Sequence, residues 1–249
     1  AFSRGARPLL RCRGIRIEGN GQIEVFHQAG NDEVVLATLG RGDIIGEMSL
    51  IDNQPRMASA RVVGDTKLTV ITREDLATRL SKLSKQLLTL ASLDKDDGLI
   101  QHEPINMTQL LHGLMKQTRW LWERKDLAVS IEADDVTYIG HEELLYQAFE
   151  NLLANSIKYT PPGGEINLFL HKHQRGFRFI IQDSGIGIPP EHQVKIFERF
   201  YKADPSRSKE KDSSGLGLSI VKKIITLHHG EIHVESKTNK GTTFTVTLP

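Results

Sequence analysis

The sequence contains a single cysteine, Cys12, in 249 residues. One cysteine excludes an intramolecular disulfide, and such sparse use of cysteine is typical of a reducing compartment. No apolar run approaches the roughly 20 residues that span a bilayer, and the N-terminus carries no signal-peptide pattern. We therefore expect a cytoplasmic protein with no membrane span. The sequence begins at Ala1 without a methionine, which we interpret as a fragment or a processed product.

The sequence also lacks an excess of charge of either sign. Lysine and arginine together number 32 and aspartate and glutamate 31, so the formal net charge is +1. Nucleic-acid-binding domains usually carry a clear positive excess, and we expect no nucleic-acid partner. The 39% hydrophobic and 25% charged residues are ordinary for a soluble globular protein. The length allows one or two domains.

Short segments in which polar and apolar residues alternate occupy residues 1–79. This alternation predicts β-strands, and glycine- and asparagine-containing turns separate them. The predicted strands are Ile15–Ile17, Gln22–Phe26, Glu33–Leu39 and Lys67–Ile71. We expect them to form a partial antiparallel β-roll.

One segment of this region, Gly42–Ala60 (GDIIGEMSLIDNQPRMASA), has the residues of an anion site. A helical turn beginning at Gly46 would point backbone N–H groups at an anion, and Arg56 could bind a phosphate with two hydrogen bonds. The segment resembles the phosphate-binding cassette of cyclic-nucleotide-binding domains. The resemblance implies a second ligand site, in which Glu47 contacts a ribose and Arg56 a cyclic phosphate. The alternative is an inherited fold with a disabled pocket, because the helix and two strands that begin the family's barrel are not found.

A run of leucines at spacings of four and three follows. It predicts a helix with a heptad-like seam, formed by Leu76, Leu80, Leu83, Leu87 and Leu90. We expect a connecting helix within residues 80–103, ended by the acidic turn Asp94–Gly98. Two interpretations of the seam compete: it packs on its own domain, or it pairs with a second copy in a homodimer through residues 76–93.

Residues 104–249 alternate between predicted helices and predicted strands. The helices are Thr108–Lys125, His141–Thr160, Gln193–Phe197 and Leu218–His228. The strands are Leu127–Ile131, Val136–Ile139, Glu165–His171, Gly176–Gln182, Glu231–Glu235 and Thr243–Leu248. This order predicts an α+β fold, a two-layer α/β sandwich in which helices cover one face of one mixed sheet.

The predicted helix His141–Thr160 has a polar side of unusual composition. Amide side chains recur there every four residues, opposite the apolar face, and a lysine and a tyrosine follow: Gln147, Asn151, Asn155, Lys158 and Tyr159. A face exposed only to water usually carries lysine and glutamate. The row therefore predicts the wall of a polar pocket, and the alternative is a solvated face that happens to contain amides.

Three glycine-containing segments lie beyond this helix. In Asp183–Pro189 (DSGIGIP), an ionised Asp183 can accept a hydrogen bond from an exocyclic amine, and its glycines allow close approach of a flat ligand. The segment Ser213–Ser219 (SSGLGLS) opens a helix whose free N–H groups can bind phosphates. The third, Lys240–Phe244 (KGTTF), is a turn into the last strand. One such segment is weak evidence, but three in this order predict a nucleotide site.

These motifs resemble those of the catalytic ATP-binding domain of sensor histidine kinases, in the superfamily that includes gyrase and the Hsp90 chaperones. Four segments match: the N box Asn151–Thr160, the first G box Asp183–Gly187, the F box Ile196–Tyr201 and the second G box Gly215–Leu218. The resemblance implies an ATP-binding domain at residues 104–249. Residues 80–103 resemble the second helix of the family's dimerisation domain, and residues 1–79 remain as a partial cyclic-nucleotide-binding-like domain.

The resemblance also implies roles for single residues, with ATP and Mg²⁺ as the cofactors. Asn155 would place its side-chain oxygen on Mg²⁺, Asn151 would lie on the Mg²⁺ and phosphate side, and Lys158 would reach phosphate oxygens. Tyr159 would flank the nucleotide, and Asp183 would hold the adenine amine. Further nucleotide contacts are implied for Gly185, Gly187, Gly215, Leu216, Gly217, Leu218 and Thr242. Arg199–Ser214 would form a lid.

Asn151 also separates this chain from the hydrolytic members of the superfamily. Those members carry a glutamate four residues before the Mg²⁺-binding asparagine, where it activates water. An amide is a poor base. We therefore expect slow hydrolysis and phosphoryl transfer to another nucleophile, with Asn151 and Lys158 as the catalytic residues.

A histidine kinase also needs a histidine that accepts the phosphate. In the family pattern an acidic residue follows that histidine and a proline stands five positions after it, and none of the ten histidines fits. The prediction is thus an ATP-binding sensor histidine kinase of a two-component system that acts in trans or is inactive. Its partner would be a response regulator or another kinase chain that carries the acceptor histidine. The alternative is a non-catalytic module in which nucleotide binding switches partner association.

Overall fold

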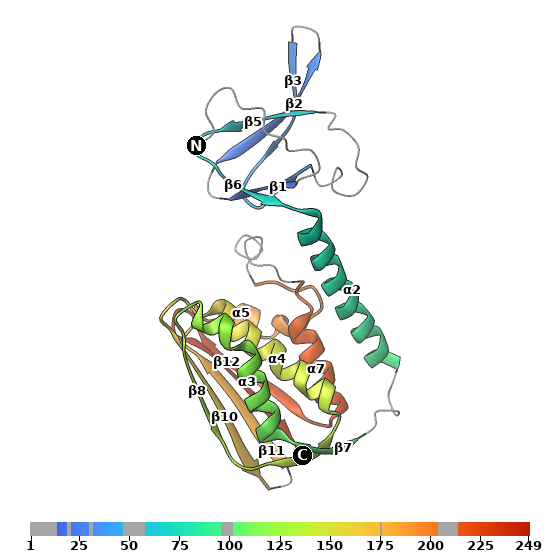
Figure 1. Cartoon of the computed structure of the whole chain (residues 1–249), viewed down its shortest axis with the longest axis vertical. Helices are drawn as coiled ribbons and strands as arrows, with labels where there is room; N and C mark the ends of the chain where they lie inside the picture. Colours follow the sequence, from blue (N-terminus) through green and yellow to red (C-terminus); the bar gives the residue numbers. More distant parts are fainter. Residues whose placement is uncertain are drawn as a thin grey trace. The chain divides into compact units, whose positions relative to one another are not determined.

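The computed structural model describes residues 14–18, 21–29, 32–46, 58–95, 102–174, 176–203 and 214–249. The chain divides into two compact units, and the division falls within one helix, after Ser84. Figure 1 traces the elements of each unit in sequence order. The described elements that precede this helix are all strands, whereas the larger unit combines helices and strands.

The smaller unit contains two antiparallel three-stranded sheets in its described part. In one sheet, β1 (Gly14–Glu18) lies between β4 (Ile44–Ile45) and β6 (Lys67–Ile71). In the other, β2 (Gln22–Ala29) lies between β3 (Asp32–Leu39) and β5 (Ser59–Val63). A small core joins the buried side chains of Ile17, Ile23 and Ile45. The four predicted strands are confirmed, but β4 and β5 were not predicted, because β4 is very short and β5 is exposed along its whole length and has no alternating pattern.

The helix α2 (Arg73–Lys95) begins three residues before Leu76, the first leucine of the predicted seam. Thr72 Oγ1 accepts a hydrogen bond from the backbone N–H of Asp75 (3.1 Å), and Asp75 Oδ2 accepts one from the backbone N–H of Thr72 (2.9 Å). This reciprocal arrangement is a capping box. The cap therefore sets the start of the helix, and the leucine pattern does not.

The larger unit is built on one five-stranded sheet of order β12-β13-β11-β10-β8. Its strands are β8 (Ala128–Ala133), β10 (Glu165–His173), β11 (Gly176–Asp183), β12 (Glu231–Lys237) and β13 (Gly241–Leu248). Neighbouring strands are antiparallel except β8 and β10, which pair in parallel. A parallel pair requires a crossover connection, and here the crossover contains the helix α4 (Glu142–Tyr159).

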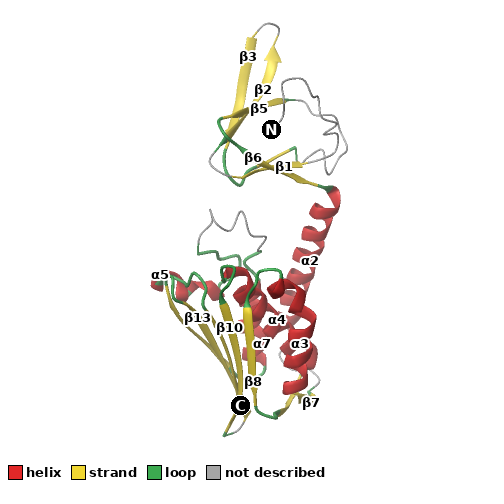
Figure 2. Cartoon of the chain, turned by 60° about the vertical axis from the view of Figure 1, so that its left-hand side comes forward, coloured by secondary structure: helices red, strands yellow, loops and turns green. Residues whose placement is uncertain are grey.

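Three helices cover one face of this sheet, as Figure 2 shows. They are α3 (Met107–Glu123), α4 and α7 (Gly217–Leu227). Each helix buries one apolar side, and the three central strands β10, β11 and β13 bury about every second residue. The core extends from Leu111 through Phe149 to Phe179 and Val246. The rings of Phe149 and Phe179 meet at 4.5 Å between centroids. The predicted α+β sandwich with a mixed sheet is confirmed.

Two local predictions for the larger unit were wrong. The predicted strand Val136–Ile139 is β9 (Thr137–Gly140), but it pairs with β7 (Glu103–Asn106) in a separate two-stranded sheet. The strand β7 was not predicted, because it is only four residues long, contains Pro104 and has no alternating pattern. The predicted helix Gln193–Phe197 is divided into α5 (Pro190–Gln193) and a 3₁₀ turn η1 (Lys195–Phe197). Proline fits the first position of a helix, which places the start of α5 earlier than predicted.

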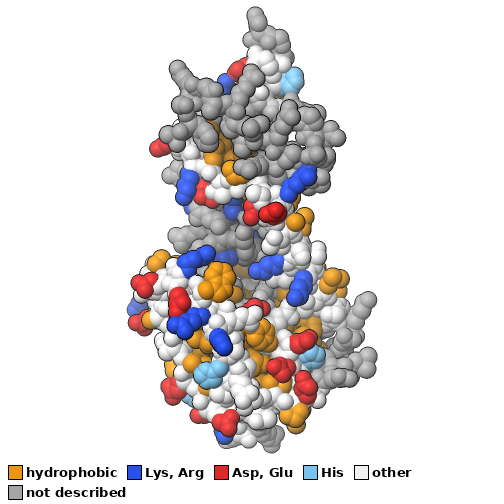
Figure 3. Space-filling model, viewed as in Figure 1, with side chains coloured by type: hydrophobic (Ala, Val, Ile, Leu, Met, Phe, Trp, Pro, Cys, Tyr) orange, Lys and Arg blue, Asp and Glu red, His pale blue; other side chains and the backbone are white. Residues whose placement is uncertain are grey.

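On the face of the larger unit shown in Figure 3, side chains of both charges are interspersed with apolar ones. None of the helices in the described part of the chain combines the length and the apolar composition that a membrane span requires.

Candidate functional site

The carboxylate of Asp183 in the larger unit is held by three hydrogen bonds. It lies at the end of β11, where β11 pairs with β13, and it is only 6% exposed. Its Oδ1 accepts hydrogen bonds from the backbone N–H groups of Gly185 (2.9 Å) and Thr242 (3.3 Å). Its Oδ2 accepts a hydrogen bond from the hydroxyl of Ser156 on α4 (3.2 Å). Three separate segments therefore hold this carboxylate in one orientation.

Burial raises the pKa of Asp183, because removal from water disfavours the charged form. The hydrogen bonds from Gly185, Ser156 and Thr242 act in the opposite direction, since they stabilise the carboxylate. Because burial is the larger effect, the three hydrogen bonds only partly offset the cost of removing the Asp183 carboxylate from water. A ligand that donates a hydrogen bond to the carboxylate would offset more of this cost.

Several residues near this carboxylate must be glycine, because a Cβ atom there would overlap neighbouring atoms of the protein. A Cβ atom on Gly185 would lie 2.6 Å from Asp183 Oδ1 and 2.9 Å from the carbonyl oxygen of Tyr159. Gly241 has a φ of 99°, and a Cβ there would lie 1.8 Å from the carbonyl oxygen of Asp183. Gly187 instead packs on the end of β12, where its Cβ would lie 2.1 Å from the carbonyl oxygen of Lys237. The protein's own backbone approaches each glycine closely, which is a reason for glycine in addition to access for a ligand.

The amide row of α4 is half-buried. Asn151 Nδ2 donates a hydrogen bond to the carbonyl oxygen of Gln147 (3.0 Å). Its Oδ1 is directed toward the start of α7, where a Cβ on Gly217 would lie 3.2 Å away. Asn155 is also half-buried and stands beside Ser156 in the sequence. The row thus borders other parts of the protein and is not a fully solvated face.

The last turn of α4 is joined to the loop that follows Asp183. The carbonyl oxygen of Tyr159 accepts a hydrogen bond from the backbone N–H of Ile186 (3.3 Å). The ammonium of Lys158 lies 5.1 Å from the centre of the Tyr159 ring, within the range of a cation–π interaction. The end of the N box and the first G box are therefore held together.

The F box and the second G box meet at Phe200 and Gly215. The backbone N–H of Phe200 donates to the carbonyl oxygen of Gly215 (3.0 Å), and both residues have positive φ values, 62° and 75°. A Cβ on Gly215 would lie 2.7 Å from the backbone of Phe200. The next residue, Leu216, is fully buried. This contact fixes the two flanks of the predicted lid, whose residues 204–213 lie outside the described part of the chain.

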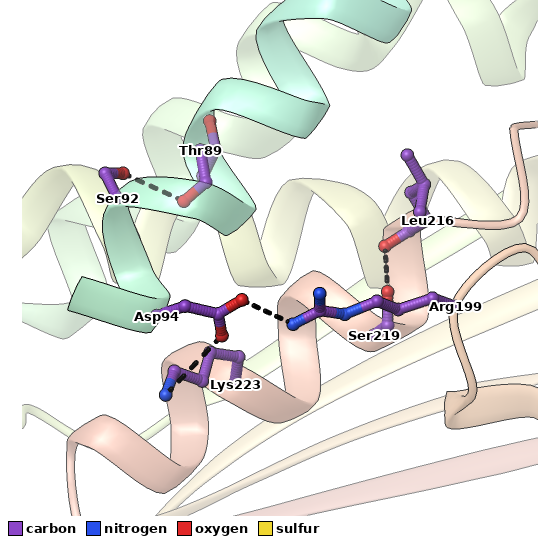
Figure 4. Close-up of polar contacts among 7 residues, drawn as sticks. All are labelled: Thr89, Ser92, Asp94, Arg199, Leu216, Ser219 and Lys223. Atoms are coloured by element: carbon purple, nitrogen blue, oxygen red, sulfur yellow. Dashed lines mark hydrogen bonds and ion pairs between the residues drawn. The ribbon is translucent and has the colours of Figure 1, made fainter.

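The second half of α2 contacts the same two flanks within the larger unit. In Figure 4, Asp94 lies between Arg199 and Lys223, with N···O distances of 2.7 and 3.8 Å. On the other flank, Ser214 Oγ donates to the side-chain oxygen of Gln86 (2.7 Å). Polar contacts with one helix thus border the start and the end of the predicted lid.

Two of the histidines in the larger unit, His228 and His141, have structural roles. His228 is 1% exposed, its Nδ1 lies 2.8 Å from the carbonyl oxygen of Ile224, and its Nε2 accepts from the backbone N–H of His141 (3.0 Å). This pattern requires the neutral ring with its proton on Nδ1, and burial lowers the pKa of His228. His141 caps α4 by accepting from the backbone N–H of Leu144. Both ring nitrogens of His228 are thus occupied within the protein, which leaves this ring unsuited to accept a phosphate.

The structure brings most of the residues predicted for the site into two neighbouring groups. Asp183, Gly185, Thr242 and Tyr159 are connected by the contacts described above, and Asn151 adjoins Gly217. Leu218 is half-buried at the start of α7. Glu47 and Arg56, the predicted second ligand site, lie outside the described residues. Sequence reasoning missed Ser156, for which a serine between Leu153 and Ile157 on an apolar helix face was the available signal; it noted Gly241 only as part of a turn into the last strand.

Two family models match the chain. Residues 140–249 match the histidine kinase-, DNA gyrase B- and HSP90-like ATPases, and residues 13–82 match the cyclic nucleotide-binding domain. The heme sensor protein HssS of Staphylococcus saprophyticus is 39% identical over 174 residues, and that of Staphylococcus aureus is 38% identical. These matches cover 70% of this chain but 37% of each relative, so the chain spans little more than a third of their length.

Solved structures of histidine kinase domains are also similar. The mycobacterial sensor histidine kinase MprB is 32% identical, with a TM-score of 0.53 over 59% of this chain and 97% of that one. The catalytic domain of the histidine kinase ThkA is 26% identical, with a TM-score of 0.54 over 60% of this chain and 96% of that one. The chain therefore belongs to the family of histidine kinase-, DNA gyrase B- and HSP90-like ATPases, and within it to the sensor histidine kinases.

Proposed function

We propose that residues 104–249 bind ATP between α4, the end of β11 and the start of α7, and that the bound ATP donates its γ-phosphoryl group to a histidine of another chain. The observation that carries this proposal is the buried, oriented carboxylate of Asp183. An ionised carboxylate only accepts hydrogen bonds. It therefore suits the exocyclic amine of adenine and rejects the carbonyl that guanine presents at the same edge.

The phosphates would lie toward the start of α7. The first N–H groups of a helix have no intrahelical acceptor, and the helix dipole favours an anion there. Gly215, Leu216 and Gly217 lead into this helix, and Asn151 Oδ1 faces it. Lys158, in the last turn of α4, would supply a cation to the phosphate oxygens.

Mg²⁺ fits the chemistry of the available donors. No group of three or more His, Cys, Asp or Glu side chains is placed to hold a metal ion in the described part of the chain. Mg²⁺ prefers oxygen ligands and usually retains waters and phosphate oxygens. The side-chain oxygen of Asn155 would hold the ion together with the nucleotide, and the ion would neutralise charge on the phosphates.

The nucleophile would be an imidazole nitrogen. Transfer breaks the bond between the γ-phosphorus and the β–γ bridging oxygen, forms a phosphorus–nitrogen bond and releases ADP. Asn151 cannot act as a base toward water, because it is an amide and its Nδ2 already donates to Gln147. Slow hydrolysis would preserve ATP for transfer to the histidine. That histidine would belong to a second kinase chain, and the phosphate would then pass to a response regulator.

The connecting helix α2 would provide the contact with a second copy. Leu90 and Leu93 are buried in the larger unit, whereas Leu80 and Leu88 are 53% and 71% exposed. Both interpretations of the leucine seam would then hold on one helix: its exposed leucines would pair with a second copy, whereas Leu90 and Leu93 pack on their own unit.

Calorimetric titration of the whole chain with ATP and MgCl₂ tests the binding step. We expect saturable binding that Asn155→Ala and Asp183→Ala weaken by at least about tenfold, as expected for the loss of a charged or metal contact. Asp135→Asn is the matched control, because Asp135 is an exposed acid of the same unit. No binding at millimolar ATP would exclude the proposal.

Incubation with γ-labelled ATP tests the transfer step. The chain alone should acquire no acid-labile, base-stable phosphate, whereas a histidine-containing dimerisation domain from a sensor kinase should acquire it when added. Labelled phosphate on the chain alone would show that one of its own histidines is an acceptor. Saturable binding with no transfer to any added histidine domain would favour the non-catalytic module.

A further inference from the structure

The C-terminal end of α4 is held by a lysine from outside the helix. The ammonium of Lys125 donates hydrogen bonds to the carbonyl oxygens of Ile157 (2.5 Å), Lys158 (3.2 Å) and Thr160 (2.5 Å). A helix leaves its last four carbonyl groups without intrahelical partners. In α4 these belong to residues 156–159, and Lys125 donates to two of them.

The other two carbonyl groups also have partners. That of Ser156 accepts from the backbone N–H and the hydroxyl of Thr160, at 3.0 and 2.7 Å. That of Tyr159 accepts from the backbone N–H of Ile186. The last turn of α4 is thus completely hydrogen-bonded, and the bond to Ile186 leads directly to the loop that contains Gly185 and Asp183.

Lys125 is itself held in a rigid turn. Its backbone N–H donates to the carbonyl oxygen of Trp122 (3.1 Å), and its carbonyl oxygen accepts from Gly163 (3.3 Å). The next residue, Asp126, lies in the turn that follows α3 and has a φ of 54°, in the left-handed region. The position of the ammonium is therefore set by the junction of α3 and β8 on one side and by the turn that follows α4 on the other.

A cation is well suited to this position. The C-terminal end of a helix carries a partial negative charge, and hydrogen bonds from a charged donor are stronger than neutral ones. Lys158, which belongs to the same turn, directs its ammonium toward the ring of Tyr159. If the carbonyl of Lys158 lost its partner, the turn that orients Lys158 and Tyr159 would be free to shift relative to Asp183.

We propose that Lys125 is a positioning residue of the nucleotide site: by capping α4 it fixes Lys158 and Tyr159 relative to the loop that carries Asp183. This inference rests on the proposed function, because the residues that it positions are those assigned to ATP. It assigns to Lys125 no contact with the nucleotide.

Amide hydrogen exchange of Ile186 tests the proposal without nucleotide. In Lys125→Met the exchange should be at least about tenfold faster than in the wild-type chain, because the Tyr159 carbonyl that accepts this N–H is no longer held. Lys125→Arg, which keeps the cation and its donors, should restore slow exchange. Should Lys125→Met not fold, Lys125→Gln takes its place, since it keeps N–H donors without the charge. Unchanged Ile186 exchange in a folded variant without the cation would overturn the proposal.

ATP affinity provides the second measurement. Lys125→Met should raise the Kd for Mg·ATP by roughly tenfold, as expected for the loss of charged hydrogen bonds, and Lys125→Arg should recover most of the affinity. Lys116→Met, which changes an exposed lysine of α3, is the charge control. Leu111→Ala, a cavity variant in the buried side of α3, is the stability control: it should lower the unfolding midpoint but leave the affinity of the folded protein unchanged.

The two proposals fail in different ways. If the wild-type chain does not bind ATP, the proposed function is wrong, and the Ile186 exchange still decides whether Lys125 fixes the end of α4. If the wild-type chain binds ATP and Lys125→Met binds it equally well, Lys125 does not position the site. If Leu111→Ala loses as much affinity as Lys125→Met, the effect is one of general stability and the positioning role is excluded.

Discussion

The two units of the chain bury their apolar residues very differently. In the larger unit, three helices cover one sheet face, and Phe149, Phe177 and Phe179 are fully buried. In the smaller unit, the described core consists of a few isoleucines, and the valines of β3 and β5 are exposed. A buried charge such as that of Asp183 requires rigid surroundings that supply its hydrogen bonds. The larger unit meets that requirement at Asp183.

The largest effect is expected when one apolar side chain is truncated in each unit, a buried one in the larger unit and an exposed one in the smaller unit. Phe179→Ala should lower the free energy of unfolding of the larger unit by about 3–5 kcal/mol, because it leaves a cavity in a packed core. Val35→Ala, on exposed β3, should change the free energy of unfolding of the smaller unit by less than about 0.5 kcal/mol. Urea unfolding followed by tryptophan fluorescence measures Phe179→Ala, because both tryptophans, Trp120 and Trp122, lie in the larger unit, and exchange of the β2 amides measures Val35→Ala. A cost below about 1 kcal/mol for Phe179→Ala would contradict the packed core.

The next test uses the raised pKa of Asp183. Its protonated form cannot accept the adenine amine in the same way, so ATP affinity should fall as the pH decreases toward that raised pKa. The stability of the ligand-free protein should change in the opposite direction, because the folded state binds the Asp183 proton more tightly than the unfolded state does. The contribution of this proton to the free energy of unfolding is full below the unfolded pKa and is lost as the pH rises through the folded pKa. Binding isotherms from pH 5 to pH 8, compared with Asp183→Asn, measure the first effect. Affinity that rises on acidification would contradict it.

A smaller effect is expected from His228. Burial lowers its pKa from the ordinary 6.5, and the nearby His102, His141 and His229 act in the same direction. The unfolded chain then binds the proton more readily, so the stability of the larger unit should decrease as the pH falls below about 6.5. Urea midpoints from pH 5.5 to pH 7.5 check this. No buried histidine is present among the described residues of the smaller unit, where exchange of the β2 amides should show no equivalent loss.

The smallest effect is expected for Arg61 in the smaller unit. It pairs with Glu24 (2.7 Å) and Glu33 (2.5 Å) and lies over the ring of Phe26. These are exposed ion pairs, and exposed pairs contribute little and are screened by salt. Arg61→Met should therefore leave the exchange of β2 amides nearly unchanged at physiological salt. A clear acceleration would show that this surface network holds the sheet together.

Periodic patterns in the sequence predicted most of the larger unit. The apolar side of α4 and the alternation in β10, β11 and β13 reflect burial on one side of an element, which a local pattern records. The start of α2 and the strand β7 do not follow from such patterns, because a cap at Thr72 and a pairing with β9 determine them. Sequence periodicity thus finds elements better than it finds their ends or partners.

The site residues also fall into those that a local sequence pattern predicts and those that depend on packing. Asp183 and the amide row were found because carboxylates and amides are rare at such positions and lie near glycine-containing segments. The contact of Ser156 with Asp183 and the close approach of Gly241 depend on how α4, β11 and β13 pack, and no local pattern contains that information. The capping role of Lys125 could not be predicted either, because it joins two turns that are far apart in the sequence.

The parallel pairing of β8 with β10 has a consequence for how the protein folds. The amide row lies inside the crossover between these strands, so this helix cannot be docked until residues far apart in the sequence have met. Closing such a long connection costs entropy and slows folding. We expect the ability to bind nucleotide to return during refolding with the slow, global phase, and not with the early formation of helices.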